Sequence, residues 1–328
     1  MIDANVIEAS ALAPVLSANP ICYVDVGARG GFGNDLLPLA FCVDAIGFEP
    51  NPDEFAALDN QELGPWRSRQ FLPFAISAEG GRQTLFVPDD PQAASLLQSD
   101  KVICAPFGKS QFFESKEEIV VDTWKLSDIL DENSAPDPDC LKLDIEGAEY
   151  GVLKSIEKLL TNLCVVKVEV AFLPFRVKHP VSAEIELHMK SHGFELIDLL
   201  DAAHWRFMGD VIHPLASKEK IPYSRGQLVH GDYLFFRSFD SLNLETEPGR
   251  AQALKAAALA MSYGYFDHAA RILFDPRMSG WLSLHGVNNV PELLSEVSTA
   301  YGRTAMRQGF ARQLRGLLPF LRRIMQMV

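Results

Sequence analysis

The sequence lacks an excess of positive charge. Its 328 residues include 30 Lys and Arg against 43 Asp and Glu, which gives a formal net charge of -13. A protein that acts on nucleic acid needs a basic groove to neutralise phosphates, so we expect no nucleic acid among its partners. The composition is otherwise typical of a soluble globular protein, with 48% hydrophobic and 22% charged residues.

Long apolar runs and cysteines with ligand spacing are lacking as well. No run of 18 apolar residues could span a membrane, and we expect no basic-then-apolar targeting leader. Of the five cysteines, Cys22, Cys140 and Cys164 stand in predicted buried strands. They are typical of small core residues in a reducing compartment, and not of zinc ligands or a disulfide framework. We therefore predict a cytoplasmic protein.

The most informative segment that is present covers residues 22–52. An apolar run is followed by a glycine-rich turn at residues 27–31, and a second apolar run ends at Phe48-Glu49-Pro50. A strand, a turn, a helix and a second strand in this order build a nucleoside site. Glycines let the backbone approach the ligand, and Glu49 at the tip of the second strand can accept hydrogen bonds from both ribose hydroxyls.

The spacing of the glycines distinguishes between nucleoside cofactors. A dinucleotide fingerprint needs Gly-x-Gly-x-x-Gly, but Arg29 stands where the second glycine counted from Gly27 should be. Asp25, Gly27 and Gly30 instead fit the Asp-x-Gly-x-x-Gly form that holds S-adenosylmethionine, whose cationic amino-acid end suits a nearby acid. We predict this cofactor; the alternative is an ordinary glycine turn in an α/β core.

A second motif identifies a family. Residues 138–153 read PDCLKLDIEGAEYGVL, an apolar strand that ends in Asp144 and is followed by a helix. Together with VDVGARGG, GFEPNPDEF and VVKVEV, this block resembles the FkbM family of S-adenosylmethionine-dependent methyltransferases over about residues 22–237. The LKLDIEGAE block is the most specific part. The family usually carries Asn where this chain has Arg29.

The resemblance implies a Rossmann-like class I methyltransferase fold with S-adenosylmethionine as its cofactor. It also implies O-methylation of a hydroxyl on a sugar, polysaccharide, glycolipid or related small molecule, so the partner would be a small-molecule, carbohydrate or lipid-linked acceptor. The cofactor contacts that it implies, together with the glycine motif, are Asp25, Gly27, Ala28, Arg29, Gly30, Glu49, Pro50, Asn51, Ala75, Ile76 and Asp144.

Two acids at predicted strand ends are the catalytic candidates, Asp144 and Glu169. Ligands of an open parallel sheet lie outside the carboxyl ends of its strands. Period-two alternation places Lys142 and Asp144 on one face, so Asp144 is the first candidate to contact the cofactor's amino group or orient the acceptor. Glu169 interrupts an apolar strand, where a carboxylate is costly unless it is paired or faces a site. It could take the acceptor's proton, or pair with Lys142.

Other polar residues near these acids indicate a functional role less clearly. Glu146 is expected to cap the following helix, and Glu149 either faces solvent or contributes to the site. The carboxylates of Asp144, Glu146 and Glu169 could bind a divalent ion, but no spacing requires one, and we predict no metal. The histidines show no ligand spacing; His204 and His230 are those that could reach the cleft.

Alternating apolar runs and helical patterns predict an α/β fold with a doubly wound, mostly parallel sheet. Strands are expected near 22–26, 44–49, 70–74, 140–144, 164–170, 195–200 and 231–237. Helices are expected near 3–18, 33–40, 52–59, 125–131, 147–160 and 182–192. The last two strands would form the sheet edge, with one antiparallel strand.

A long insertion at residues 78–122 precedes the fourth parallel strand. Its pieces Gln83–Val87 and Glu118–Val121 predict a hairpin, and the loop between them could hold a substrate. We expect an N-terminal helix (1–21), a methyltransferase domain (22–239) and a helical C-terminal extension (240–328). The extension should begin with two helices over 249–274 that turn at Tyr263-Gly264-Tyr265, and a further helix should follow Pro291.

The tail combines an apolar seam with arginines. Phe310, Leu314, Leu317, Leu321, Ile324 and Val328 recur at spacings of four and three, the period of a helix seam. Pro319 should kink or restart this helix. The favoured interpretation is a contact with the protein's own body or with a second subunit, which would make a homo-oligomer. The alternative is a basic helix resting on an anionic membrane surface.

Two other functions stay open. One is an NAD-dependent sugar-modifying enzyme, such as a dehydrogenase or epimerase; Arg29 in the glycine turn and the DIEGAE block argue against it. The other is a catalytically degenerate cofactor-binding scaffold whose helical tail is the working part. The intact glycine turn, Glu49 and Asp144 argue against the scaffold.

Overall fold

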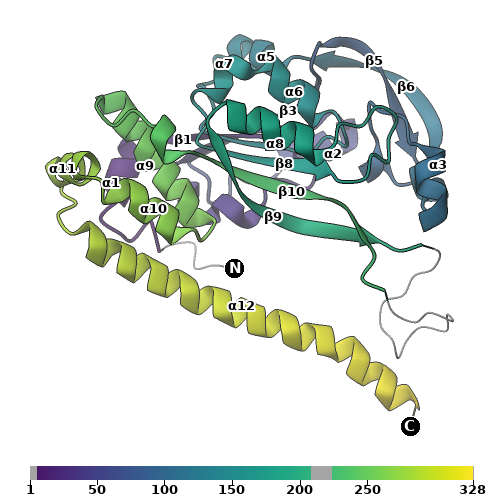
Figure 1. Cartoon of the computed structure of the whole chain (residues 1–328). Coiled ribbons are helices and arrows are strands. Elements are labelled where there is room, and N and C mark those ends of the chain that lie inside the picture. Colours follow the sequence, from purple (N-terminus) through teal and green to yellow (C-terminus); the bar gives the residue numbers. More distant parts are fainter. Residues whose placement is uncertain (1–5, 208–223, 328) are drawn as a thin grey trace.

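A computed structural model describes the backbone of residues 6–207 and 224–327. Side chains are described over the same ranges, except at 111, 308–309 and 311–327. Figure 1 shows a central sheet with helices on both faces, a strand pair at one end and a long helix along the lower side.

Seven strands form the main sheet. They are β1 (Ile21–Val26), β2 (Val43–Phe48), β3 (Ser68–Leu72), β7 (Cys140–Leu143), β8 (Val165–Ala171), β9 (Phe194–Trp205) and β10 (Gln227–Arg237). Their order is β3-β2-β1-β7-β8-β10-β9; the pairs from β3 to β8 are parallel, and β10 is antiparallel to both neighbours. The predicted doubly wound, mostly parallel sheet with an antiparallel strand at one end is therefore confirmed.

Both faces of the sheet are covered, which explains why its central strands are mainly apolar. All six residues of β1 are buried, including Asp25. One face packs against α1 (Ala13–Ala18), η1 (Asn34–Cys42), α9 (Glu247–Ser262), α10 (Phe266–Leu273) and α11 (Pro276–Leu284). The other face packs against α5 (Leu126–Glu132), α6 (Glu149–Ser155), α7 (Glu157–Leu160) and α8 (Ser182–Ser191). Parallel strands buried on both faces lose the polar alternation of half-exposed strands.

The C-terminal helices contribute to the main core. Leu254, Leu259 and Met261 of α9 are buried in one cluster with Tyr23 of β1 and Leu39 of η1. The predicted turn between two helices is present, because α9 ends at Ser262 and α10 begins at Phe266. Residues of the predicted extension thus help to cover the sheet that carries the site.

The helix α12 (Val290–Met327) begins on the body and then leaves it. Leu293, Leu294 and Val297 are buried, whereas Phe310 is 66% exposed. The helix continues through Pro319, so the predicted restart there is wrong. The rest of the predicted seam lies outside the described side chains, and the homo-oligomer, the membrane contact and the cytoplasmic location stay predictions.

Two other predicted helices differ in their bounds. The N-terminal α-helix begins at Ala13 instead of residue 3, because Pro14 suits the first helical turn and Ser10 ends the preceding turn by donating to the Ile7 carbonyl. Residues 3–5 lie outside the described chain. The helix predicted over 147–160 is two helices, α6 and α7, which meet at Ile156.

The predicted hairpin in the insertion is confirmed. Strand β5 (Gly81–Pro88) pairs antiparallel with β6 (Ser115–Trp124), and β4 (Ala75–Ile76) pairs parallel with β6. Four short helices connect the hairpin strands: η2 (Pro91–Ala93), α3 (Lys101–Cys104), η3 (Ala105–Phe107) and α4 (Ser110–Phe113). The remaining elements are α2 (Pro52–Asp59), which follows β2, and η4 (Phe239–Ser241), which follows β10.

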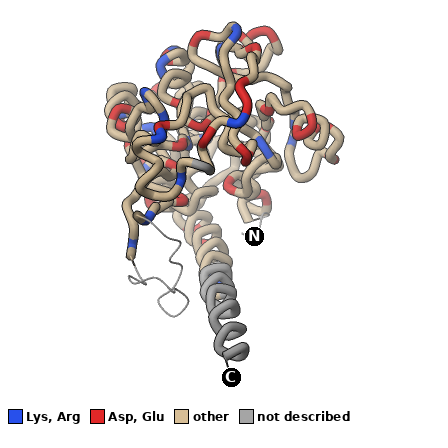
Figure 2. Tube along the Cα trace, turned by 90° about the vertical axis from the view of Figure 1, so that its right-hand side faces the viewer, with Lys and Arg blue, Asp and Glu red and all other residues tan. Residues whose placement is uncertain are grey.

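The distribution of charged and apolar residues along the described chain agrees with the amino-acid composition of the sequence. Figure 2 shows acidic and basic residues interspersed along the body. Among residues 6–207 and 224–327, no helix combines the length and the apolar character that a bilayer crossing requires.

If α9 is part of the main core, Leu259→Ala should lower the free energy of unfolding by about 2–5 kcal/mol, as for other buried leucines. Leu259 is 0% exposed. The matched control is Leu284→Ala in α11, because Leu284 is 85% exposed and its loss should change stability by less than about 0.5 kcal/mol. Denaturant unfolding measures both; equal effects would show that α9 does not help to hold the sheet.

Candidate functional site

The glycine turn is packed backbone to backbone against the loop after β7. Gly27 has φ +91°, and a Cβ added there would lie 2.0 Å from the carbonyl oxygen of Asp144. The Asp144 amide donates to the Val26 carbonyl at 3.0 Å, and the Gly27 and Ala28 amides donate to the Phe48 carbonyl at 3.2 and 2.9 Å. The ends of β1, β2 and β7 are therefore held together by main-chain contacts.

The rest of the turn leaves room for a ligand. Gly30 has φ +74°, and a Cβ added there would meet no heavy atom of the described chain within 4 Å. Arg29 lies between these glycines, and its Nη2 contacts Glu54 Oε1 of α2 at 3.0 Å. About a third of each side chain is exposed, so the charge of Arg29 is already paired at the edge of the turn.

Glu49 occupies the tip of β2, as predicted. It is 5% exposed, and its Oε1 accepts a hydrogen bond from the Asn51 amide at 2.8 Å. Its Oε2 has no hydrogen-bond partner among the described residues and could accept from a ribose hydroxyl. Burial raises the pKa of Glu49, while the Asn51 amide and the Arg29 charge oppose that rise. Asn51 in turn caps α2, and Pro50 between them is exposed.

Asp25 is buried and already paired. Its Oδ2 accepts from the Tyr23 hydroxyl at 3.0 Å, and its Oδ1 accepts from Lys142 Nζ at 3.2 Å. Lys142 Nζ also lies 3.4 Å from Asp144 Oδ2, which confirms that Lys142 and Asp144 share a face. The Asp144 side chain is 42% exposed, whereas that of Asp25 is 1% exposed. Asp144 is thus the open end of this chain of charges, and a cofactor contact by Asp25 stays a prediction.

Ala75 and Ile76 form β4, beyond the carboxyl end of β3. Ala75 is half-buried, and Ile76 is 4% exposed in the core beside Leu126. Ala75 pairs with Thr123 of β6, so the hairpin of the insertion begins next to the predicted cofactor residues. This position fits their predicted role, which stays a prediction.

Glu169 pairs with His230, and not with Lys142. His230 Nδ1 lies 3.1 Å from Glu169 Oε1. In the parallel register Lys142 is beside Lys167, so Glu169 extends one pleat farther toward the carboxyl edge and meets the neighbouring β10 instead. Burial raises the pKa of Glu169 well above its usual value, and the nearby Glu146 and Asp144 charges add to this. Burial lowers the pKa of His230.

Residues 144–149, which read DIEGAE, form a loop up to the first residue of α6 (the DIEGAE loop), and the side chains of its own acids stabilise it. Glu149 is 3% exposed, and its carboxylate accepts from the amides of Ile145 and Gly147 at 2.8 and 2.9 Å. The solvent-facing role considered for Glu149 is therefore wrong. Burial, with a contribution from the charge of Glu169, raises the pKa of Glu149 to about 8. Glu146 does not cap a helix; it has φ +60° and its carboxylate bonds to Arg176.

The insertion reaches this loop and lines one side of the site. Ser95 Oγ donates to the Glu146 carbonyl at 2.6 Å, and the Asp100 amide donates to the Phe175 carbonyl at 2.8 Å. Behind these contacts lies an aromatic cluster, composed of Phe107, Phe113, Phe175 and Trp205. The tilted rings of Phe175 and His230 have centroids 6.0 Å apart. The predicted substrate loop and the acids thus adjoin.

The sequence did not single out Arg176, and it left His230 among several histidines. No motif marks either residue, because their partners lie 30 and 61 positions away along the chain. For His230 one signal was available: it precedes an apolar strand in a doubly wound fold, and neighbouring strands bring their ends together. His204, the other histidine considered, is exposed on β9.

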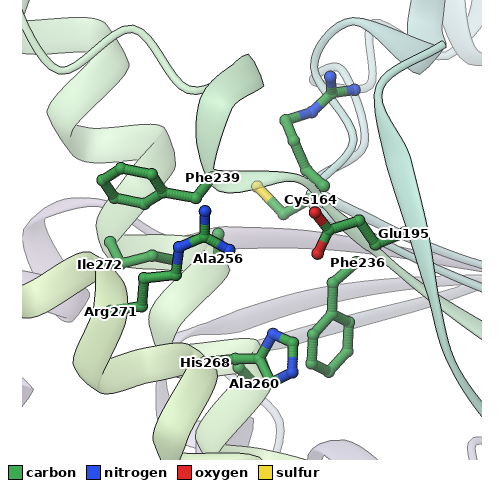
Figure 3. A pocket seen from close by; sticks show the side chains of 10 residues that line it. Cys164, Glu195, Phe236, Phe239, Ala256, Ala260, His268, Arg271 and Ile272 are labelled. Atoms are coloured by element: carbon green, nitrogen blue, oxygen red, sulfur yellow. The ribbon is translucent and has the colours of Figure 1, made fainter. Parts of the chain in front are cut away.

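A separate pocket lies between α9, α10 and the β9–β10 edge (Figure 3). It is lined by ten residues and encloses about 360 Å³ when the adjoining open solvent is counted. Figure 3 shows Arg271 and Glu195 directed toward the hollow near Cys164. Neither the glycine turn nor the acid cluster contributes to its lining, so this pocket is separate from the predicted site.

The family model for the methyltransferase FkbM domain matches residues 25–196, just over half of the chain. The chain therefore belongs to the FkbM family of methyltransferases. Its cofactor is S-adenosylmethionine, as predicted. The turn that a Cβ would fill at Gly27, the open Gly30 and the acid at Glu49 fit this cofactor's nucleoside and amino-acid parts.

The chain is similar to two solved structures of methyltransferases at low identity. One is a TehB-like S-adenosylmethionine-dependent methyltransferase from Corynebacterium glutamicum, 12% identical, with 72% of this chain and 86% of that chain covered and a TM-score of 0.31. Another is magnesium protoporphyrin IX methyltransferase from Synechocystis with bound S-adenosylmethionine, 14% identical, with 72% and 78% covered and a TM-score of 0.31. No curated protein matches the chain.

Gly27→Ala should abolish cofactor binding, because the new Cβ would force the turn away from Asp144. The control is Gly81→Ala in β5, where φ is +82° and a Cβ would meet no heavy atom within 4 Å. Both variants carry the cost of a left-handed backbone, about 1–2 kcal/mol. Calorimetric titration with S-adenosylmethionine should show binding in the control and none in Gly27→Ala; equal affinity would remove the turn from the site.

Glu49→Gln should weaken S-adenosylmethionine binding at least about tenfold, since hydrogen bonds to a charged acceptor contribute about 1.5–3 kcal/mol. The amide keeps an oxygen for the Asn51 amide, so the fold should be preserved. Asp53→Asn, an exposed acid of α2, is the control and should bind normally. An unchanged dissociation constant for Glu49→Gln would contradict the predicted ribose contact.

Proposed function

We propose that the chain transfers the methyl group of S-adenosylmethionine to a hydroxyl oxygen of a sugar, polysaccharide, glycolipid or related acceptor. The observation that carries this proposal is the 3.1 Å pair of His230 and Glu169, which lies at the carboxyl end of β8 near Asp144. A hydroxyl must lose its proton as it is methylated, and this pair is a suitable base.

Bound S-adenosylmethionine supplies an electrophilic methyl group. The chain's own task is to hold the acceptor oxygen in line with that carbon and to remove the proton. When His230 donates its Nδ1–H to the Glu169 carboxylate, Nε2 keeps a lone pair that can accept the proton. Burial lowers the pKa of His230 and so favours the uncharged imidazole that this role requires.

Asp144 supports the opposite side of the same site. Lys142 pairs with the Asp144 carboxylate and donates to Asp25, which also accepts a hydrogen bond from the Tyr23 hydroxyl. The exposed part of Asp144 is left to accept a hydrogen bond from the cofactor's amino group or from a second acceptor hydroxyl. These contacts hold the Asp144 carboxylate in one position, although part of the side chain is exposed to solvent.

The groups around the acids support a hydroxyl-rich acceptor. The Arg176 side chain is 2% exposed, and its Nε has no hydrogen-bond partner in the described chain. Nδ1 of His179 is also buried without a hydrogen-bond partner in the described chain. Buried polar atoms of this kind call for water or a ligand. Together with the aromatic cluster behind them, they offer both polar and apolar contact, which suits the edges and faces of a sugar ring.

His230→Gln and Glu169→Gln should lower kcat by about 10²–10⁴-fold, the usual contribution of a positioned base, and leave the affinity for S-adenosylmethionine unchanged. Asp144→Asn should lower kcat at least about tenfold. His204→Gln, on the exposed surface of β9, is the matched control and should retain full activity. Normal turnover in the first two variants would place the base elsewhere.

The pH dependence of kcat/KM provides a second test of the pair. The active form has an ionised Glu169 and an uncharged His230. Because burial raises the pKa of Glu169, activity should fall on acidification already above the pH range in which an ordinary carboxyl group is protonated. The carboxylate strengthens proton binding by the imidazole, and Glu169→Gln removes it; the acid limb should therefore move to lower pH in this variant. An acid limb at the same pH in both proteins would contradict the coupling.

The acceptor class is tested with methyl-labelled S-adenosylmethionine and an extract of the cells that make the protein. Label should appear in a carbohydrate-containing product as a base-stable methyl ether, and the His230→Gln protein should transfer far less. Label in protein or nucleic acid, or in a base-labile methyl ester, would contradict O-methylation of a hydroxyl.

A further inference from the structure

Three potential metal ligands meet away from the cofactor site. Glu157 begins α7, His188 lies near the end of α8, and His192 follows α8 directly. One ligand atom of each residue lies within 4.8 Å of the other two. We propose that these side chains bind a zinc ion, a function separate from methyl transfer.

The group lies at the end of the sheet opposite the glycine turn. β9 begins two residues after His192, and its Phe194 pairs with Arg237 of β10. Arg237 donates its amide to Cys164 at the amino end of β8, whereas the glycine turn follows the carboxyl end of β1. Figure 1 shows α7 and α8 on the same face of the sheet. A metal here would join these two helices without touching the acceptor.

The two imidazoles lie side by side. Residues four apart in a helix share a face, and the ring centroids of His188 and His192 are 4.4 Å apart. His192 Nδ1 lies 2.9 Å from the His188 carbonyl oxygen, so a proton on Nδ1 leaves the Nε2 lone pair for a metal. Metal-bound histidines commonly donate their other nitrogen to a carbonyl in this way.

An independent observation points to a missing ligand at His188. Its Nε2 is buried, and it has no hydrogen-bond partner among the described residues. A buried polar atom without a partner requires an explanation, and a bound ion or water supplies one. A metal ion would give His188 Nε2 a partner. The same ion could bind Nε2 of His192, which the contact through Nδ1 leaves free.

The ligand set matches zinc in type and charge. Two imidazoles and one carboxylate supply two neutral ligands and one negative charge, and zinc is often held by such His and Glu sets with water in a fourth position. Zinc–ligand bonds of about 2.0–2.1 Å place tetrahedral ligand atoms about 3.3 Å apart. The exposed Glu157 side chain can close the remaining gap by changing rotamer.

This site departs from the absence of metal predicted from the sequence. The signal was available, because His188 and His192 form a His-x-x-x-His pair in a predicted helix. What the sequence could not supply was the third ligand, since Glu157 belongs to a different helix, 31 positions earlier, that the fold brings alongside.

The test uses the full-length protein, freed of metal with a chelator and titrated with zinc chloride by calorimetry. We expect one zinc per chain with a dissociation constant of about 1 µM or lower, and a higher melting temperature in the presence of zinc. Replacement of zinc by cobalt(II) should give the visible absorption of a tetrahedral site.

His188→Ala, His192→Ala and Glu157→Gln should each weaken zinc binding at least about tenfold. The matched controls are His204→Ala, at an exposed position of β9, and Glu186→Gln, in α8. Both variants should bind zinc as the unmodified protein does. Glu157 is exposed, so its variant should fold even if a histidine variant does not. No zinc binding by the unmodified protein, or normal binding by Glu157→Gln and by the folded histidine variants, would overturn the proposal.

Discussion

The close backbone contact between Gly27 and Asp144 is the constraint on which the site depends. No side chain fits between these residues, since a Cβ at Gly27 would lie 2.0 Å from the Asp144 carbonyl oxygen. The glycine turn and the DIEGAE loop are therefore a single rigid unit, tied also by the Asp144–Val26 hydrogen bond. This contact brings the glycine turn, which carries predicted cofactor residues, next to Asp144, a predicted catalytic residue.

Charge is arranged around that contact in two separate groups. Asp25, Lys142 and Asp144 form a chain of ion pairs that ends at an exposed carboxylate. The acids of the second group are Glu149, which is buried, and Glu169, which is half-buried, and desolvation raises the pKa of each. Buried carboxylates are costly unless hydrogen bonds or a partner compensate, and here loop amides and His230 do so. Perturbed pKa values of this kind are typical of functional sites.

Local patterns predicted the sheet, the glycine turn, Glu49 at a strand tip and the hairpin, because each depends on residues that are neighbours in sequence. Ion pairs between segments that are distant in sequence could not be predicted from local patterns. Lys142 pairs with Asp25, 117 positions away. The strand register places Glu169 beside His230 and not beside Lys142. Pro319 is a related case, since a local rule predicted a kink or a restart, and the helix continues through Pro319 without a restart. Burial of Glu149 likewise depends on loop geometry and not on helix periodicity.

The proposed role of His230 as the base is tested most directly by its protonation state in the complex with S-adenosylmethionine. Nitrogen-15 NMR of the labelled imidazole distinguishes its two neutral tautomers and its charged form. We expect an uncharged ring at neutral pH, with the proton on Nδ1 toward Glu169 and a lone pair on Nε2. A proton on Nε2, or a charged ring at neutral pH, would contradict the role of His230 as the base.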